Sequence, residues 1–256
     1  MNKGIALVTG ASSGMGLRSA QQLAARNYDL LIVSNQQEQL IEAASSLIED
    51  YGVNVIPHCQ DLASPCAADE LFEFCQKENL EVEILINDAG VFFFRELTSQ
   101  ERMAPVMLNL HILTPTRLCI LFGEQMKLRG HGYILNMSSM AAKLPMPGIT
   151  LYSATKAYLK SFSKSLYFEM RPYGVGVTTV CPAAIATPLY NLDEKLMKFA
   201  VSIGVIGTPQ WLVRRALRRM FQKRRVVRPG LMNYWLSPVI NSLPKWLVNK
   251  IWLKLR

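Results

Sequence analysis

Residues 4–16 read GIALVTGASSGMG, an apolar run that leads directly into a glycine-rich turn. The run as far as Thr9 is rich in the aliphatic and β-branched residues of a short buried strand. After the turn, apolar residues continue at helical spacing through Leu17, Ala20, Leu23 and Ala24. A strand, a glycine turn and a helix in this order predict an α/β fold whose first turn holds an anionic ligand.

The glycines of this turn have separate tasks. Gly10 allows the tight bend, Gly14 lets a pyrophosphate approach the backbone, and Gly16 lets the helix pack closely on the strand. Backbone amides at the start of the helix then hold the phosphates. The residues that we expect to contribute are Gly10, Ser12, Ser13, Gly14, Met15 and Gly16. We therefore expect a dinucleotide at this turn; the alternative is a plain strand–helix connection built from small residues.

The same alternation continues along the chain. Apolar runs at residues 29–33, 53–57, 83–87, 133–137 and 176–181 predict further strands, with helical patterns between them. Regular alternation predicts a single-domain, Rossmann-like, doubly wound parallel sheet with helices on both faces. We place this domain at residues 1–230 and a basic amphipathic C-terminal extension at residues 231–256.

The composition limits the class of protein. The 256 residues are 50% hydrophobic, which is enough for a sizeable core. The five cysteines are scattered without a Cys-x-x-Cys pair, which favours free thiols in a reducing compartment over disulfides or a metal site. The first apolar run leads straight into the glycine turn, so we expect no signal peptide, and no uninterrupted apolar run is long enough to span a bilayer. These features predict a cytoplasmic protein.

A second decisive stretch runs from Ser139 to Lys156 and reads SMAAKLPMPGITLYSATK. Tyr152 and Lys156 are four residues apart and share one face of a helix, while Ser139 ends the preceding apolar strand. A free phenol titrates near pH ~10, and a neighbouring ammonium lowers that pKa towards the range of useful proton transfer. Taken alone, this spacing more often belongs to an amphipathic helix with an ordinary surface tyrosine and lysine.

Residues after the other strands are candidates for cofactor contacts. The second strand ends in Ser34-Asn35-Gln36, with neither the acid that binds the ribose of NAD nor an arginine for the phosphate of NADP. A 2′-phosphate meets no carboxylate there, so we favour NADP(H) over NAD(H). Asp61-Leu62 follows the third strand, where the carboxylate can accept from an adenine amino group or cap the next helix.

A long helical pattern covers residues 99–129, and we expect it to be interrupted or kinked at Pro105 and Pro115. Asn109 lies inside it between two leucines. An asparagine in such a place is either a functional residue or a hydrogen-bonded polar group of the core.

Together, these pieces resemble the classical short-chain dehydrogenase/reductase family over residues 4 to about 190. The resemblance rests on the order and separation of several motifs. They are residues 9–16 (TGASSGMG), Asp61, Asn87-Asp88-Ala89-Gly90, Asn109, Ser139, residues 152–156 (YSATK), and the loop from Pro182 to Thr187.

The resemblance implies a role for each matching position. Tyr152 would be the general acid for carbonyl reduction, Ser139 would bond the substrate oxygen, and Lys156 would hold the nicotinamide ribose and lower the phenol pKa. Asn109 would hold a water that relays protons to Lys156. Further cofactor contacts would come from Ser34, Asn35, Asp61, Leu62, Asn87, Ala89, Gly90, Pro182, Ile185 and Thr187. The resemblance also implies a homo-oligomer that contacts through the catalytic helix.

Two positions depart from the family pattern. Asp88 stands where the family usually has asparagine, and an ionised aspartate accepts hydrogen bonds but cannot donate one. Ala183 replaces the glycine that usually follows Pro182. Neither position belongs to the proton-transfer group, and we interpret both as drift.

Apolar residues surround the expected site. Residues 91–94 (VFFF), Met140, Leu144, Met146, Ile149 and the largely apolar segment 189–205 favour a hydrophobic ketone or secondary alcohol over a sugar. A lipid-like substrate fits best. A soluble 3-oxoacyl-carrier-protein reductase is a second hypothesis. A nucleotide-sensing binding protein without turnover is a third, of another class.

The charge is segregated along the chain. The net charge is +9, yet no acidic residue follows Glu194, while 14 lysines and arginines do. From residue 231 to the C-terminus, tryptophans and aliphatic residues alternate with these cations at helical spacing. This pattern is typical of a helix on an anionic membrane surface. Docking on the protein itself or on a second subunit is the alternative, and no recognition motif supports nucleic acid.

Overall fold

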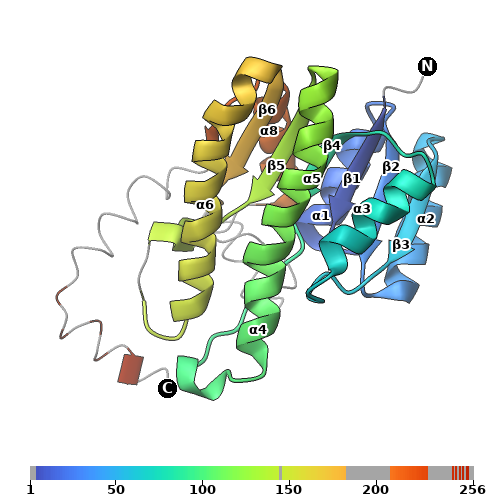
Figure 1. Cartoon of the computed structure of the whole chain (residues 1–256). Coiled ribbons are helices and arrows are strands. Elements are labelled where there is room, and N and C mark those ends of the chain that lie inside the picture. Colours follow the sequence, from blue (N-terminus) through green and yellow to red (C-terminus); the bar gives the residue numbers. More distant parts are fainter. Residues whose placement is uncertain are drawn as a thin grey trace.

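The computed structural model describes residues 4–143, 146–182 and 208–229, together with single positions between 244 and 253. Its centre is a seven-stranded sheet in the order β3-β2-β1-β4-β5-β6-β7 (Figure 1). Every neighbouring pair of strands is parallel. The strands are β1 (Ile5–Thr9), β2 (Asp29–Ser34), β3 (Val55–Cys59), β4 (Val82–Asn87), β5 (Gly132–Met137), β6 (Val175–Val180) and β7 (Val226–Val227). The predicted doubly wound parallel sheet is confirmed.

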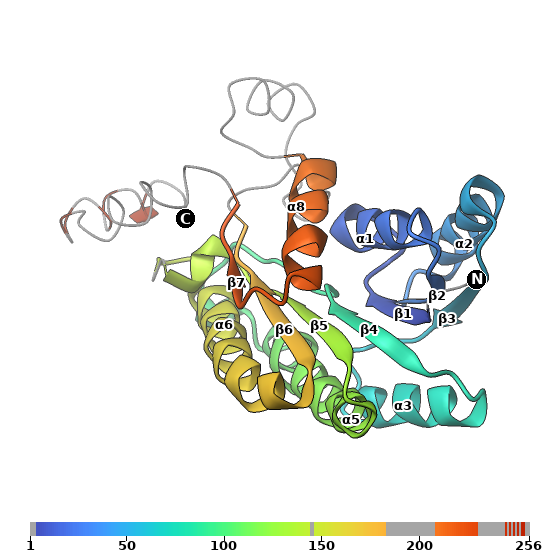
Figure 2. The ribbon, with the colours of Figure 1, turned by 90° about the horizontal axis from the view of Figure 1, so that it is seen from above.

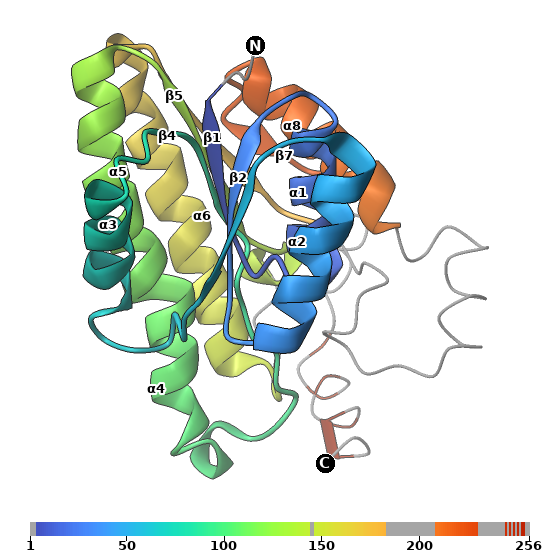
Figure 3. The ribbon, with the colours of Figure 1, turned by 90° about the vertical axis from the view of Figure 1, so that its right-hand side faces the viewer.

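Helices cover both faces of the sheet. One face carries α1 (Gly14–Ala24), α2 (Gln37–Tyr51) and α8 (Pro209–Phe221); the other carries α3 (Ala67–Lys77), α5 (Thr114–Arg129) and α6 (Thr150–Met170) (Figure 2). Seen along the sheet, the molecule has three layers (Figure 3). Short helical turns lie at η1 (Leu97–Ser99), α4 (Met103–Leu108), η2 (Asn109–Leu113), η3 (Met140–Lys143) and η4 (Arg171–Tyr173).

Two apolar cores lie between these layers because side chains alternate across each strand. Ala6 and Val8 of β1 pack towards α1, α2 and α8, whereas Leu7 packs towards α3 and α5. The central strands are therefore buried on both faces, as parallel sheets with helices on both sides require.

The strand order reverses between β1 and β4. After β1 the chain moves outwards to β2 and β3, then returns to place β4 on the other side of β1. The loops after β1 and β4 therefore leave the sheet in opposite directions and open a crevice at its carboxyl edge. Thr9 closes the floor of this crevice, since its hydroxyl oxygen accepts from the backbone N–H groups of Asp88 (3.0 Å) and Ala89 (3.1 Å).

The long helix after β4 differs from the expectation at one proline. Pro105 lies in the first turn of α4, where its missing N–H removes no helical hydrogen bond, and it causes no interruption. The irregular part is the single π-turn η2, which ends immediately before α5, with Pro115 near that helix's N-terminus. The π-turn inserts one extra residue into the helix and so rotates the side chains of α4 about the helix axis relative to those of α5.

Among the described residues, the continuous helix Met103–Arg129 is long enough to cross a membrane, and its mean hydropathy of 1.4 is high enough. We expected no run of this kind. In the structure, however, Leu118, Phe122 and Met126 of this helix are buried in the core beneath the sheet. It serves as a core helix here.

Candidate active site

The glycine-rich turn is built as a cradle for a phosphate group. Gly10 has a φ of +69°, and a Cβ on it would lie 2.9 Å from the Cα of Ala89. A Cβ on Gly16 would overlap the carbonyl oxygen of Gly10. Both positions therefore require glycine, and the backbone amides at the start of α1 remain open to an anion. This cradle fits the pyrophosphate of a dinucleotide.

A cavity of about 380 Å³ extends from this cradle across the carboxyl ends of the strands. Fifteen of the sequence-predicted residues line it: Gly10, Ser12, Ser13, Gly14, Met15, Ser34, Asn35, Asp61, Leu62, Ala89, Gly90, Ser139, Tyr152, Lys156 and Pro182. Ile185 and Thr187, like Leu144, Ala183 and segment 189–205, lie outside the described residues. Gly16, Asn87 and Asn109 are described but do not line the cavity.

Gly16 and Asn87 support the cavity from behind. Gly16 is buried against Gly10, as described above. Asn87 Nδ2 donates to Oδ1 of Asn136 on the neighbouring strand (2.8 Å), and Asn136 Nδ2 donates to Ser163 Oγ of α6 (2.8 Å). This buried chain of amides ties β4, β5 and α6 together. Asn87 thus fixes the strand ends that carry the site.

The end of β2 is uncharged in the structure. The hydroxyl groups of Ser12 and Ser34 are hydrogen-bonded (2.9 Å), and Ser34 Oγ also accepts the N–H of Gln36 (3.2 Å). The nearby guanidinium of Arg18, on α1, donates to the side chain of Gln21 on the same helix (2.7 Å). Asp61 accepts the N–H of Ala63 (3.0 Å) and so caps its own turn while lining the cavity.

Helix α6 brings Tyr152 and Lys156 together, and both side chains are buried. The ammonium of Lys156 lies 5.8 Å from the Tyr152 ring centroid and donates to the carbonyl of Met137 (3.0 Å). Burial lowers the pKa of Lys156 to about 8, although the charge of Asp88 opposes this shift. Ser139, at the end of β5, lines the same cavity and accepts the N–H of Ala141 (3.1 Å). A phenol, an ammonium and a hydroxyl therefore converge on one space.

Asp88 faces this cluster from the end of β4. Its Oδ1 is buried and has no hydrogen-bond partner among the described residues. Burial raises the pKa of Asp88 to about 7, against the opposing effects of the Lys156 charge and the Gly16 amide. Asp88 is therefore a titratable carboxyl group within the cavity wall.

The structure does not bring Asn109 into the cavity. Its side chain donates to the carbonyl of Ala63 (2.7 Å), in the turn after β3. The residue that meets Tyr152 from this helix is His111, whose ring centroid is 5.8 Å from that of Tyr152 and which lines the cavity. The π-turn explains the difference, since its extra residue rotates the helix by about 100° and regular helical spacing no longer applies. The sequence signal that could have identified His111 is a second polar residue in the same apolar run.

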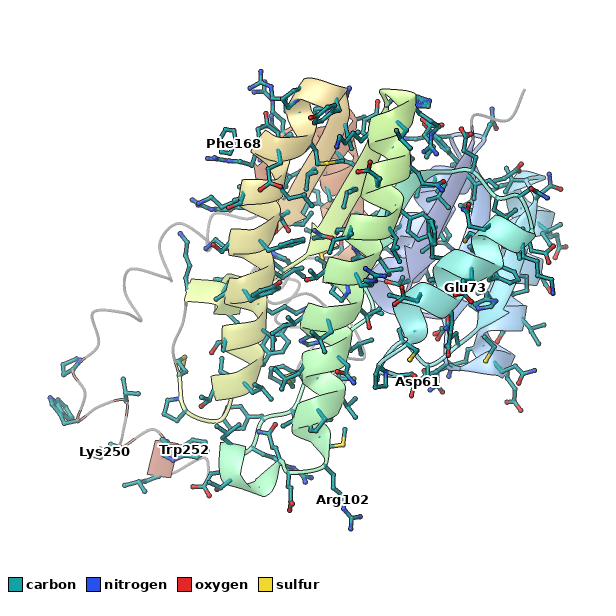
Figure 4. The ribbon with its side chains drawn as sticks, viewed as in Figure 1. Asp61, Glu73, Arg102, Phe168, Lys250 and Trp252 are labelled. Atoms are coloured by element: carbon teal, nitrogen blue, oxygen red, sulfur yellow. The ribbon has the colours of Figure 1, made fainter. Side chains whose placement is uncertain are left out.

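Aromatic rings lie beside Tyr152. The ring of Phe92 packs edge-on against Tyr152 with centroids 4.9 Å apart. Phe94 meets Trp252 of the C-terminal extension at 6.0 Å, and both rings contact the space above Gly148. Figure 4 shows Trp252 beside Lys250 near this end of the molecule. Among the described residues, no group of three or more His, Cys, Asp and Glu could hold a metal ion.

Comparison with known proteins gives a consistent result. A family model described as short chain dehydrogenase matches residues 4–196. The very-long-chain 3-oxoacyl-CoA reductase of Homo sapiens is 28% identical over 251 residues, which cover 96% of this chain and 77% of that protein. The very-long-chain 3-oxoacyl-CoA reductase-B of Danio rerio is 30% identical over 253 residues, covering 96% and 78%.

Solved structures agree with this likeness. A short-chain dehydrogenase from Sphingobium yanoikuyae in complex with NADPH is 26% identical with a TM-score of 0.80, covering 94% of this chain and 97% of that one. The bulky-bulky ketone specific alcohol dehydrogenase from Comamonas testosteroni is 27% identical with a TM-score of 0.79, covering 96% of each chain.

Proposed function

Because the chain belongs to the short-chain dehydrogenase family and is thus an NAD(P)(H)-dependent oxidoreductase, we propose that it reduces a hydrophobic, lipid-like ketone, or oxidises the matching secondary alcohol. Tyr152 is the proton donor in this proposal. The observation that carries it is the convergence of Tyr152, Lys156 and Ser139 on the cavity that also contains the phosphate cradle.

The bound dinucleotide would supply the hydride, and the side chains supply position and a proton. The Ser139 hydroxyl donates to the carbonyl oxygen of the substrate, and the Tyr152 hydroxyl gives that oxygen its proton as negative charge develops. The ammonium of Lys156 stabilises the phenolate that remains. With a pKa of about 8, Lys156 is mostly charged at neutral pH, as this role requires.

NADP(H) is the cofactor that we propose. Support comes from the end of β2, where Ser12 and Ser34 offer hydroxyl groups and Ser34-Asn35-Gln36 contains no carboxylate to repel a 2′-phosphate. In structures of this fold, an acid at this place selects NAD by bonding the ribose hydroxyl. The NADPH complex of the Sphingobium yanoikuyae relative adds to this support.

A lipid-like substrate fits both the site and the relatives. Phe92 packs on Tyr152, and Phe94 with Trp252 lies two residues further along the same loop, so the surroundings of Tyr152 favour an apolar chain over a polyhydroxylated one. The curated relatives are named as reductases of very-long-chain 3-oxoacyl-CoA. We therefore propose a long-chain 3-ketoacyl compound or a comparable ketone as the substrate.

Two surfaces suggest partners. The C-terminal extension is proposed to lie on an anionic membrane surface, since Trp246, Lys250 and Leu253 are all exposed there. A homo-oligomer is proposed to form through α5 and α6, which expose Ile120, Tyr158 and Phe168. Figure 4 shows Phe168 on the outer side of α6. The basic face of α8 would instead suit an acidic carrier protein, in which case binding would be salt-sensitive and independent of lipid.

The first test compares the wild-type protein with Tyr152→Phe. Oxidation of NADPH and of NADH is followed with a panel of long-chain ketones, and NADPH binding is measured by fluorescence. We expect turnover with NADPH that falls by about 10²–10⁴-fold in Tyr152→Phe, because proton donation is lost while binding persists. Tyr158→Phe on the same helix is the control, since that hydroxyl bonds Thr116 on the surface (3.0 Å). Cofactor binding without turnover by the wild-type protein would instead support the nucleotide-sensing alternative.

A further inference from the structure

His111 lies where three parts of the active site meet. The ring is 1% exposed and is held between the loop after β4 and the catalytic helix α6. Its Nε2 accepts the backbone N–H of Val91 (3.0 Å), and its Nδ1 is 3.1 Å from the hydroxyl of Thr155. A Cβ on Gly90 would lie 2.9 Å from Nε2, so the ring packs directly on the backbone of that loop.

These contacts fix the tautomer of the ring. A backbone N–H can only donate, so Nε2 must carry the lone pair and the proton of a neutral ring must sit on Nδ1. Nδ1–H then donates to the Thr155 oxygen, and the Thr155 hydroxyl donates in turn to the carbonyl of Tyr152 (2.9 Å). One directed chain of hydrogen bonds thus runs from Val91 through His111 and Thr155 to the backbone of Tyr152.

The same contacts prevent His111 from carrying protons. Protonation would place hydrogen on Nε2 and would break the bond to Val91. The charged or titratable side chains around the ring are Lys156 and Tyr152 on α6 and Asp88 at the end of β4. Burial and the positive charge of Lys156 hold the pKa of His111 well below its usual range.

We propose that His111 is a positioning residue, whose neutral Nδ1–H ring fixes the loop after β4 to the catalytic helix and so sets the place of Tyr152 in the cavity. Val91 continues into Phe92, whose ring packs on Tyr152 at 4.9 Å. His111 therefore restrains both the backbone of Tyr152 and the aromatic ring that covers it. The effect of His111 on catalysis rests on the proposed function, whereas its tautomer follows from the hydrogen bonds alone.

The first experiment reads the tautomer directly. Nitrogen NMR of the ¹⁵N-labelled full-length protein resolves its three histidines, His58, His111 and His131, and the His111→Asn spectrum assigns the His111 signals. We expect a protonated Nδ1 and an unprotonated Nε2 that do not change between about pH 5 and 9, whereas an exposed histidine titrates near pH 6.5. An Nε2–H tautomer, or titration of His111 in this range, would overturn the proposal whether or not the protein is a ketone reductase.

The second experiment measures position through kinetics. His111→Leu keeps an apolar side chain of similar bulk but removes both hydrogen bonds, so we expect kcat to fall by about 10–100-fold with KM changed less than about threefold. His111→Asn retains an acceptor and a donor, and we expect it to recover most of kcat. The pH profile of kcat/KM should keep its inflections in both variants, and His131→Leu, at an exposed position, should match the wild type. Loss of an inflection, or no recovery in His111→Asn, would reject the positioning role.

Discussion

Asp88 places a carboxyl group beside the turn that we propose as the cradle for the anionic cofactor. It lines the cavity beside the phosphate cradle, with a buried Oδ1 that has no partner among the described residues. Its pKa of about 7 means that the carboxyl group is neutral below this pH and ionised above it. Only the neutral form avoids repulsion with the pyrophosphate, and it also gains a proton to donate, as the amide of an asparagine would.

Cofactor affinity should therefore depend on pH through Asp88. As pH rises from 6 to 8 through the pKa of about 7, the carboxylate forms and the affinity for NADPH should fall by about tenfold in total. Asp88→Asn should remove most of this dependence and bind at least as tightly at pH 8. NADPH affinity is measured by fluorescence titration of the wild type and of Asp88→Asn at several pH values in this range. Ionisation of the cofactor itself affects both proteins equally, so a difference between them reports on Asp88. Parallel curves for the two proteins would mean that Asp88 is not the titrating group.

The contrast between Asn109 and His111 shows what the sequence could predict at this scale. Residues such as Gly10, Tyr152 and Lys156 lie in short motifs whose geometry is local, so their place at the cavity follows from the motif. Asn109 and His111 are two residues apart, about 200° around a regular helix, so only one of them can face the site. The π-turn that decides between them depends on packing against α6 and the loop after β4, which no local pattern encodes.

Among the elements, the connection from β1 to α1 determines whether a dinucleotide can bind. A methyl group on Gly16 would overlap the carbonyl group of Gly10, whose oxygen and carbon are backbone atoms that cannot move aside. Gly16→Ala should therefore force the turn apart, lowering the melting temperature and weakening NADPH binding by about tenfold or more.

The matched control for Gly16→Ala is Gly123→Ala in the middle of α5. There the added methyl group would lie 3.4 Å from the flexible end of Met170, an ordinary contact. Alanine also favours the helix by about 0.5–1 kcal/mol over glycine, so stability should hold or rise and NADPH affinity should not change. Thermal melts and binding titrations of the two variants test the turn. Equal NADPH affinity in Gly16→Ala would refute the assignment of this turn as the phosphate cradle.

At the scale of the whole molecule, the layers were predictable because the central strands are buried on both faces and the helices that cover them on one. The third strand was placed two residues too early, at 53–57 instead of Val55–Cys59. Val53 is nevertheless buried in the core, so burial alone could not mark the start of the edge strand. The residues behind the site, such as Asn87, were assigned to the cofactor because the motif gives their position in the chain but not the direction of their side chains.

Exposed apolar residues on α5 and α6 predict a dimer in solution. These helices lie side by side (Figure 1) and are joined by the Thr116–Tyr158 hydrogen bond. Ile120 is 54% exposed at the middle of this face, so Ile120→Glu would bury a charge in the interface and should yield monomers. Ile48→Glu, at a similarly exposed position on α2, should remain a dimer. Light scattering of the purified proteins measures the mass; a monomeric wild-type protein would disprove the interface.

The segregation of charge predicts where the molecule acts. Beyond Glu194 the chain is basic, and in the described part of the extension Trp246 is 66% exposed and Lys250 and Leu253 are exposed as well. Such side chains bind the interface of anionic lipid through both apolar burial and charge. The protein should therefore sediment with phosphatidylserine vesicles but not with phosphatidylcholine vesicles, and less so as salt rises.

Trp246→Ser combined with Lys250→Glu should abolish binding, whereas Trp211→Ser on α8, an exposed tryptophan outside the extension, should not. If both mutants sediment as well as the wild type, the lipid contact lies elsewhere. If the wild-type protein does not sediment, the membrane contact is wrong and the exposed apolar residues of the extension bind protein instead.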